Sequence, residues 1–472
     1  VARAQTAPTS LLPPTLGQNA PPPVEQPFGQ PLPQPQAGQQ ALPQQPLAPG
    51  PGSLGTIPAG SLGVIPRDAL DVVSGARLDE TIARITAPMP TAALQRAVRE
   101  SLIDRAIVET SSHMARARAF YALGFAEDAA GAAIEATPAS VADRALTART
   151  LLAVGQKEQA CMRADVESLP KDAEPAPTFE LLEVLAFCKL EQGSREAAQL
   201  IVKLLRDQGG GDALFFALLE PSGDQPVRLP DLGKVKRVRP IHLALMRRAG
   251  VPIPADYVMH ADLALLGAIG RSDSTDVAAR IAATERRVEA GHAPASSLIG
   301  LYETTSLDER LLMQAASGVA PSGPLARAHL FALIAEASEI SQRIGFISTI
   351  YAQARQAGVG AAIAEAIGED AAGIPSDPST GSTAALMVEI LTRADRARAA
   401  LAWIDAGEFP GPDGRPALSR FTAHVNRVLI AVSDPQLGLG VAAGTLGSDA
   451  GAAALSAAER DFVKLEVAIM SA

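Results

Sequence analysis

Two cysteines are the residues whose type and spacing most directly suggest chemistry. Cys161 and Cys188 are the only cysteines among 472 residues, and the midpoint between them falls in a proline-containing segment, 168–177. Helical patterns over 157–169 and 178–191 flank this turn, and residues equidistant from the turn of a helical hairpin lie at the same height. The sequence therefore predicts a disulfide, worth roughly 3–4 kcal/mol. The alternative is two reduced, buried thiols.

A run of basic residues is a second candidate site. Seven Lys and Arg residues lie between 228 and 248, with Asp231 as the one acidic neighbour, in a chain of formal net charge −10. Such a patch could receive an acidic protein surface, anionic lipid headgroups or peptidoglycan carboxylates. Alternatively, carboxylates from elsewhere in the fold pair with these side chains. The candidate partner-binding residues are Lys234, Lys236, Arg237, Arg239, Arg247 and Arg248.

A short apolar unit occurs twice before residue 67. Residues 53–58 read Ser-Leu-Gly-Thr-Ile-Pro, and residues 61–66 read Ser-Leu-Gly-Val-Ile-Pro. The apolar side chains, Leu54, Ile57, Leu62 and Ile65, could dock onto an edge strand or into a groove of another protein. The alternative is a slipped duplication in a low-complexity region.

Catalytic motifs are weak, and we expect no active site, metal or cofactor. The six histidines are isolated, and neither His-x-x-x-His nor Cys-x-x-Cys occurs. Glu100-Ser101 and Leu312-Met313-Gln314 resemble motifs of lytic transglycosylases, murein-cleaving periplasmic enzymes, and this resemblance implies an alternative function with Glu100 as the acid. In that family the two motifs lie close in sequence, whereas here more than 200 residues separate them. We therefore interpret Glu100 as a surface carboxylate.

Helices are the elements expected to position these residues. Leu94, Val98, Leu102, Ile103 and Ile107 recur at helical spacing, which predicts one helix over 91–109 with a single buried stripe. No segment shows the alternation of a strand. Similar patterns predict helices near 114–123, 126–136, 139–153, 157–169, 178–191, 194–208, 274–291, 322–338, 341–357, 382–394, 395–406, 416–432 and 456–470.

Residues 114–208 contain a repeated pattern. Leu123-Gly124-Phe125-Ala126 is similar to Val154-Gly155-Gln156-Lys157 and to Gln192-Gly193-Ser194-Arg195, with an echo at Ala394-Asp395-Arg396-Ala397. Glycine tolerates the left-handed conformation that ends a helix. The pattern resembles the tetratricopeptide-repeat family, which implies a curved α-solenoid that binds protein segments. The alternative is a set of chance helical hairpins in an alanine-rich chain.

The chain divides by composition into four regions. Residues 1–66 hold 16 prolines and 10 glutamines but two charges, so we expect a disordered arm, partly in polyproline II conformation. Two helical-repeat regions are expected at 67–208 and 261–472. Between them, 209–260 is expected to be a junction that carries the basic patch and a short apolar helix over 213–219.

Compartment and function follow as expectations. Ala2-Arg3-Ala4 before Gln5 fits the small-x-small cleavage pattern of a secretory signal peptide, although such triplets also arise by chance in an alanine-rich chain. We expect a periplasmic, non-enzymatic scaffold or adaptor in a bacterial flagellar motor, pilus, secretion or cell-wall machine. A cytosolic adaptor is the alternative. The net charge of −10 disfavours nucleic acid as a partner, and no apolar run is long enough to span a membrane.

Overall fold

The computed structural model of the protein describes most of the chain from residue 75 to residue 430. The described ranges are 75–89, 91–164, 174–219, 227–272, 275–306, 308–316, 322–376, 380–408 and 416–419, with a few helical residues up to 430. All of them belong to one compact unit, residues 57–472. The predictions for the N-terminal arm, for Leu54, Ile57, Leu62 and Ile65, for the cleavage site and for a helix near 456–470 lie outside the described residues.

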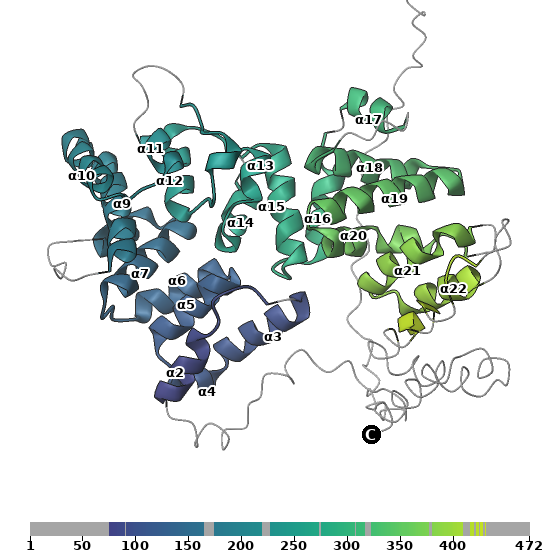
Figure 1. Cartoon of the computed structure of the whole chain (residues 1–472), viewed down its shortest axis with the longest axis horizontal. Helices are drawn as coiled ribbons and strands as arrows, with labels where there is room; N and C mark the ends of the chain where they lie inside the picture. The colour runs from purple at the N-terminus through teal and green to yellow at the C-terminus, as the bar shows by residue number, and fades with distance from the viewer. Residues whose placement is uncertain are drawn as a thin grey trace, which may run out of the picture. The chain divides into compact units, whose positions relative to one another are not determined.

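The described residues are all-α, as the sequence predicts, with one isolated bridge between Val238 and Ala261. Neighbouring helices pack as antiparallel pairs, for example α5 with α6 and α9 with α10 (Figure 1). The first helices are α2 (Gly75–Ala83), α3 (Ala92–Ile103), α4 (Arg105–Thr110), α5 (His113–Leu123), α6 (Ala126–Glu135), α7 (Val141–Ala153), α8 (Lys157–Arg163), α9 (Pro175–Glu191), α10 (Arg195–Asp207) and α11 (Ala213–Leu219).

The remaining helices include ones that the sequence patterns did not predict, such as the short α14 and α16 and the longer α20. In chain order they are η1 (Leu232–Lys234), α12 (Pro240–Ala249), α13 (Ala255–Val258), α14 (Leu263–Gly270), α15 (Val277–Glu289), α16 (Ala295–Glu303), α17 (Glu309–Ala316), α18 (Pro324–Glu336), α19 (Ile340–Gln356), α20 (Gly360–Ala372), η2 (Gly381–Thr383), α21 (Ala384–Arg393) and α22 (Ala397–Glu408).

Among the described residues, the hydrophobic core forms two clusters that meet in α15. The first cluster runs from Leu78 to Ala283 and the second from Ile281 to Ile430. Alanine supplies many of the fully buried positions, which lets helix backbones approach closely. Helices α11 and α12, in the expected junction 209–260, belong to the first cluster, and α12 packs on α7 and α9.

One turn geometry ends eight of the described helices. Its central residue has positive φ. The residue after it donates its backbone N–H to the carbonyl that lies five positions before that donor, which is the Schellman arrangement. Gly124, Gly155 and Gly193 take this position with φ of 89°, 82° and 77°, as the sequence predicts for helix-ending glycines. The echo residue Asp395 adopts it without glycine, at φ 57°. The eight bonds start at Phe125, Gln156, Ser194, Gly210, Val251, His292, Val359 and Arg396.

The helix predicted over 91–109 is wrong in two respects. It breaks at Asp104, where ψ is 136°, so that α3 and α4 are separate. Leu94 and Ile103, expected in the buried stripe, are 44% and 48% exposed. Leu102 of the expected stripe is buried on α3, and so is the Gln95 amide, whose polar atoms are satisfied by the backbone of residues 89 and 123.

Gln95 also fixes α3 against the turn that follows α15. Its Nε2 lies 3.0 Å from Nε2 of His292, and the Phe125 and His292 rings are 4.4 Å apart. Burial lowers the pKa of His292 to about 4, so the ring is neutral near pH 7 and can accept from the Gln95 amide. This contact joins residues nearly 200 positions apart around Gly124.

We expect Gly124→Ala to destabilise the protein far more than Gly193→Ala. Both glycines have positive φ, so a side chain at either costs about 1–2 kcal/mol. A Cβ at Gly124 would lie 2.5 Å from His292 and 2.6 Å from Leu263, whereas a Cβ at Gly193 meets nothing within 4 Å. Overpacking adds about 1–3 kcal/mol to the Gly124 variant alone. Urea unfolding of both variants measures the difference, and equal losses would contradict the packing described here.

Candidate functional site: an arginine-lined cleft

The two cysteines come together as the sequence predicts. Cys161 on α8 and Cys188 on α9 have Cα atoms 5.6 Å apart, and their sulfur atoms are at disulfide distance, 1.98 Å. They border a surface cavity of about 410 Å³. Lys157 and Glu191 pair with each other at 2.6 Å, and the third charged residue on this cavity is the acidic Glu158, so the cavity offers an anionic ligand no unpaired cation.

The predicted basic patch separates into paired and unpaired residues. Arg237, Arg239 and Arg248 form ion pairs with Asp262, Glu183 and Glu191, respectively. Arg247 donates to the carbonyl of Ala268 at 3.1 Å. Lys234 and Lys236 are exposed, and within the described part of the chain they form no ion pair. Internal carboxylates thus take up much of the charge, which was the alternative interpretation.

One member of the basic patch, Arg237, lines a cleft of about 400 Å³ that we name the arginine cleft. Its walls come from the segment after α2, from α5, α7 and α15, and from the backbone on either side of the Val238–Ala261 bridge. Four arginines and a single aspartate lie among its lining residues, which are Ile85, Thr86, Ala87, Pro88, Arg118, Tyr121, Ala122, Leu146, Arg149, Arg237, Ala261, Asp262, Leu263 and Arg286.

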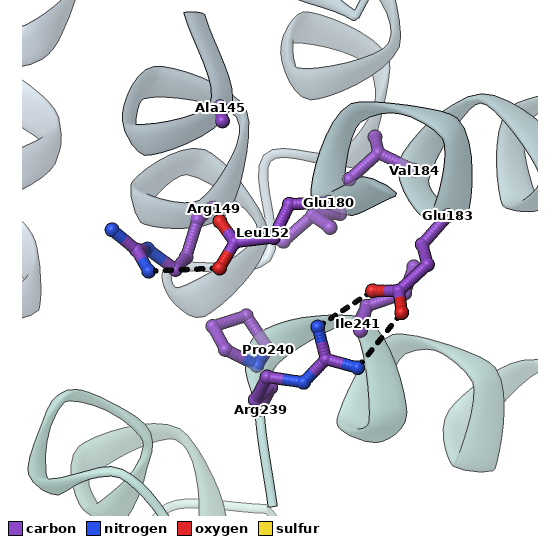
Figure 2. A pocket seen from close by; sticks show the side chains of 9 residues that line it. All are labelled: Ala145, Arg149, Leu152, Glu180, Glu183, Val184, Arg239, Pro240 and Ile241. Atoms are coloured by element: carbon purple, nitrogen blue, oxygen red, sulfur yellow. Dashed lines mark hydrogen bonds and ion pairs between the residues drawn. The ribbon is translucent and has the colours of Figure 1, made fainter. Parts of the chain in front are cut away.

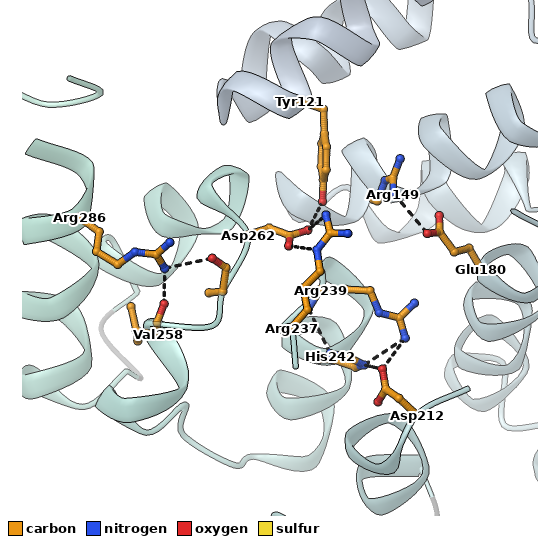
Figure 3. Close-up of polar contacts among 11 residues, drawn as sticks. Tyr121, Arg149, Glu180, Asp212, Arg237, Arg239, His242, Val258, Asp262 and Arg286 are labelled. Atoms are coloured by element: carbon orange, nitrogen blue, oxygen red, sulfur yellow. Dashed lines mark hydrogen bonds and ion pairs between the residues drawn. The ribbon is translucent and has the colours of Figure 1, made fainter. Parts of the chain in front are cut away.

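Asp262 is the centre of the polar network in the arginine cleft. The Tyr121 hydroxyl donates to Asp262 Oδ2 at 2.6 Å, and Arg237 Nη2 donates to the same oxygen at 3.0 Å. Figure 3 shows the hydroxyl and the guanidinium converging on this carboxylate. Burial, together with the charge on Asp262, raises the pKa of Tyr121 well above its usual value. The hydroxyl therefore stays protonated and serves as a donor.

The other three arginines of the cleft differ in their partners. Arg118 lies 3.1 Å from Asp143 and Arg149 lies 3.3 Å from Glu180. Arg149 also sits over the Tyr121 ring, 4.7 Å from its centroid. Arg286 donates through Nη1 to the carbonyls of residues 258 and 261, the latter at 3.0 Å. Figure 3 shows this side chain directed at the backbone rather than at a carboxylate.

A second cavity beside the arginine cleft is too small for a ligand. It measures about 20 Å³, room for no more than one water molecule. The pairs Arg149–Glu180 and Arg239–Glu183 face it from two sides (Figure 2). Arg239 binds Glu183 with two bonds of 2.6 and 2.9 Å and also contacts Asp212 at 2.8 Å. We interpret this cluster as structural.

A similar arrangement is fully buried in the second hydrophobic cluster. Tyr302 donates to Glu285 at 2.6 Å, and Arg327 Nε donates to the same Glu285 oxygen at 2.7 Å. The Arg327 and Glu285 side chains are 5% and 1% exposed, whereas Arg237 is 53% exposed beside a 6% exposed Asp262. The same combination of Tyr, carboxylate and Arg is therefore sealed in the core at Glu285 and open to a cleft at Asp262.

Sequence reasoning pointed to Arg237 but missed the other residues of the arginine cleft. Tyr121, Arg149, Asp262 and Arg286 belong to separate helices and loops, and no local spacing relates them. Within its own segment, each of these residues looks like an ordinary polar residue of a helix surface. Only a contact map between distant segments could have grouped them.

The described residues offer neither a metal-binding cluster nor a membrane-spanning helix. Among the described residues, no group of three or more His, Cys, Asp or Glu side chains is placed to hold a metal ion. None of the described helices combines the length and the apolarity needed to cross a bilayer. Glu100, the acid of the alternative enzyme function, is half-buried on α3, where the neighbouring Ser101 hydroxyl bonds to its own helix at Ala97, 3.0 Å away.

We expect Arg327→Met to cost about 3–5 kcal/mol of unfolding free energy, because it leaves Glu285 charged and buried without its cation. Arg237→Met is the matched variant and should cost about 1–2 kcal/mol, since water already screens this half-exposed guanidinium. Chemical denaturation of the two proteins tests this order. A larger loss for Arg237→Met would mean that Arg237 is structural and would remove the main reason for considering the cleft functional.

Comparison of the chain with protein-family models, with curated proteins and with solved structures finds no match.

Proposed function

We propose that this chain is a non-enzymatic, exported scaffold or adaptor of the bacterial envelope that binds other proteins through an α-solenoid of helical hairpins. The observation that carries the proposal is the arginine cleft, which is open on a body built from packed helix pairs. Repeated hairpins with the same turn geometry support the likeness to tetratricopeptide repeats. A flagellar motor, pilus, secretion or cell-wall machine is the proposed setting.

The cysteine pair supports the proposed compartment. Disulfides persist in oxidising environments such as the periplasm and are rare in the cytosol. The two sulfur atoms at disulfide distance fit an exported protein, and the alternative of a cytosolic adaptor calls for free thiols.

We expect the Cys161–Cys188 link to be oxidised in native cells and to contribute about 3–4 kcal/mol to stability, because it closes a loop across a sequence separation of 27. Protein denatured without reductant should resist alkylation at both cysteines. Reductant should lower the stability of the wild type, but not that of a variant with both cysteines changed to alanine. Alkylation of both thiols in freshly denatured protein would refute the oxidised pair and favour the cytosol.

The partner-binding role is tested by cross-linking and affinity purification of the tagged protein from native cells, with and without residues 5–66. We expect the full chain to recover a defined envelope complex. Partners that are recovered with the full chain but not with the chain lacking residues 5–66 are the ones that the arm binds. Recovery of monomer alone from both samples would contradict the scaffold. Muropeptide release that disappears in Glu100→Gln would instead establish the murein-cleaving alternative.

A further inference from the structure

We infer that the arginine cleft binds a carboxylate group carried by a polypeptide partner. The inference rests on the proposed function, because it names the chemistry by which such a scaffold would hold its partner. It specifies the ligand class and the arginine most directly responsible, neither of which follows from a general role in protein binding.

The first argument is the charge balance of the cleft. Arg118, Arg149 and Arg237 each face one carboxylate, namely Asp143, Glu180 and Asp262, respectively. Arg286 is different, because no carboxylate of the described residues lies within ion-pair distance of it. The cleft is thus left with about one uncompensated positive charge. One carboxylate, with a charge of −1, would neutralise that surplus. A phosphate dianion would add a second negative charge close to Asp262, which is unfavourable.

The second argument is the set of donors that Arg286 keeps available. A guanidinium has five N–H groups, and the two backbone carbonyls engage only its Nη1 atom. The Nε and Nη2 groups form the edge that binds a carboxylate with two parallel bonds, and among the described residues this edge has no partner. Burial lowers the pKa of Arg286, so an anion beside it would offset the cost of keeping it charged.

The third argument is the size and polarity of the walls. A cleft of about 400 Å³ is at the small end of the range for ligand sites. Ile85, Pro88, Leu146 and Leu263 place apolar surface beside the arginines. This combination fits one residue that bears both a carboxylate and an aliphatic part. An apolar C-terminal residue and a glutamate side chain share this chemistry.

The test uses the full chain and three synthetic peptides, with binding measured by calorimetry or ligand-observed NMR. The probes are acetyl-Gly-Gly-Leu with a free C-terminal carboxylate, the same peptide amidated, and amidated acetyl-Gly-Glu-Gly. We expect the first or the third peptide to bind with a dissociation constant of about 1 mM or tighter, and the amidated leucine peptide to bind at least about tenfold more weakly. The stronger of the two carboxylate peptides identifies the source of the group.

Variants connect this binding to the cleft. Arg286→Gln should weaken the carboxylate peptide about tenfold or more, and Arg286→Lys, which keeps the charge but loses the planar edge, should weaken it less. Arg271→Gln is the matched control, since this exposed arginine pairs with Glu127 outside the cleft lining and its loss should leave binding unchanged. If Arg286→Gln fails to fold, the inference is tested with Arg286→Lys and Arg237→Gln, both of which should weaken binding of the carboxylate peptide.

Three results would overturn the inference. The first is binding of the amidated leucine peptide as tight as that of the tighter carboxylate peptide. The second is carboxylate binding that survives both Arg286→Gln and Arg237→Gln, and the third is tighter binding of inorganic phosphate than of either carboxylate peptide. The proposed function fails separately. If the full chain still recovers an envelope complex from cells while no carboxylate peptide binds, the scaffold stands and the ligand assignment is wrong.

Discussion

The fold depends on one backbone device, the left-handed turn that closes a helix with a bond to the carbonyl five residues earlier. It satisfies carbonyls that would otherwise be unpaired at the helix end, and it reverses the chain within a few residues. Eight described helices use it, although their spacing along the sequence is irregular. The turn can therefore stay constant while helix length varies, which explains how a weak and uneven sequence repeat can give regular pairs of helices. Gly124 shows the constraint most clearly, because both its backbone conformation and its contact with His292 exclude a side chain.

Close packing of small residues leaves the register of the helices to be fixed by polar contacts. Alanine contacts bring helices together, but they offer few features that distinguish one register from the next. Three of the four tyrosines meet this need by donating to a carboxylate that also binds arginine. They are Tyr121 with Asp262, Tyr302 with Glu285, and Tyr351 with Glu389. Each joins different helices or loops, so each contact is made in one register only. The contact at Asp262 is the one that also borders the arginine cleft, which places an open site on a rigid support.

Much of the fold could be predicted from the sequence, whereas most of the site could not. Helices such as α5, α6 and α21 match their predicted ranges within two residues. The equal distance of Cys161 and Cys188 from the predicted turn correctly indicated that the two side chains are in contact. The break at Asp104 was missed because the apolar spacing continues across it. The buried Gln95 has partners at residues 89, 123 and 292, the last almost 200 residues away, and no local pattern relates them. Helices rich in glycine and alanine, such as α20, lacked a distinct apolar stripe. The arginine cleft is formed by residues from 85 to 286, and such long-range proximity has no local signature.

The link between α8 and α9 has a mechanical consequence for a molecule that is pulled at its two ends. An unfolding chain lengthens by roughly 3.4 Å for each residue released. With Cys161 and Cys188 joined, the intervening stretch, a separation of 27 residues, stays outside the load path. Roughly 90 Å of contour length is thereby withheld from extension. Under tension the oxidised protein would reach its limit earlier than the reduced one, so the redox state of one hairpin changes how far the whole chain can stretch.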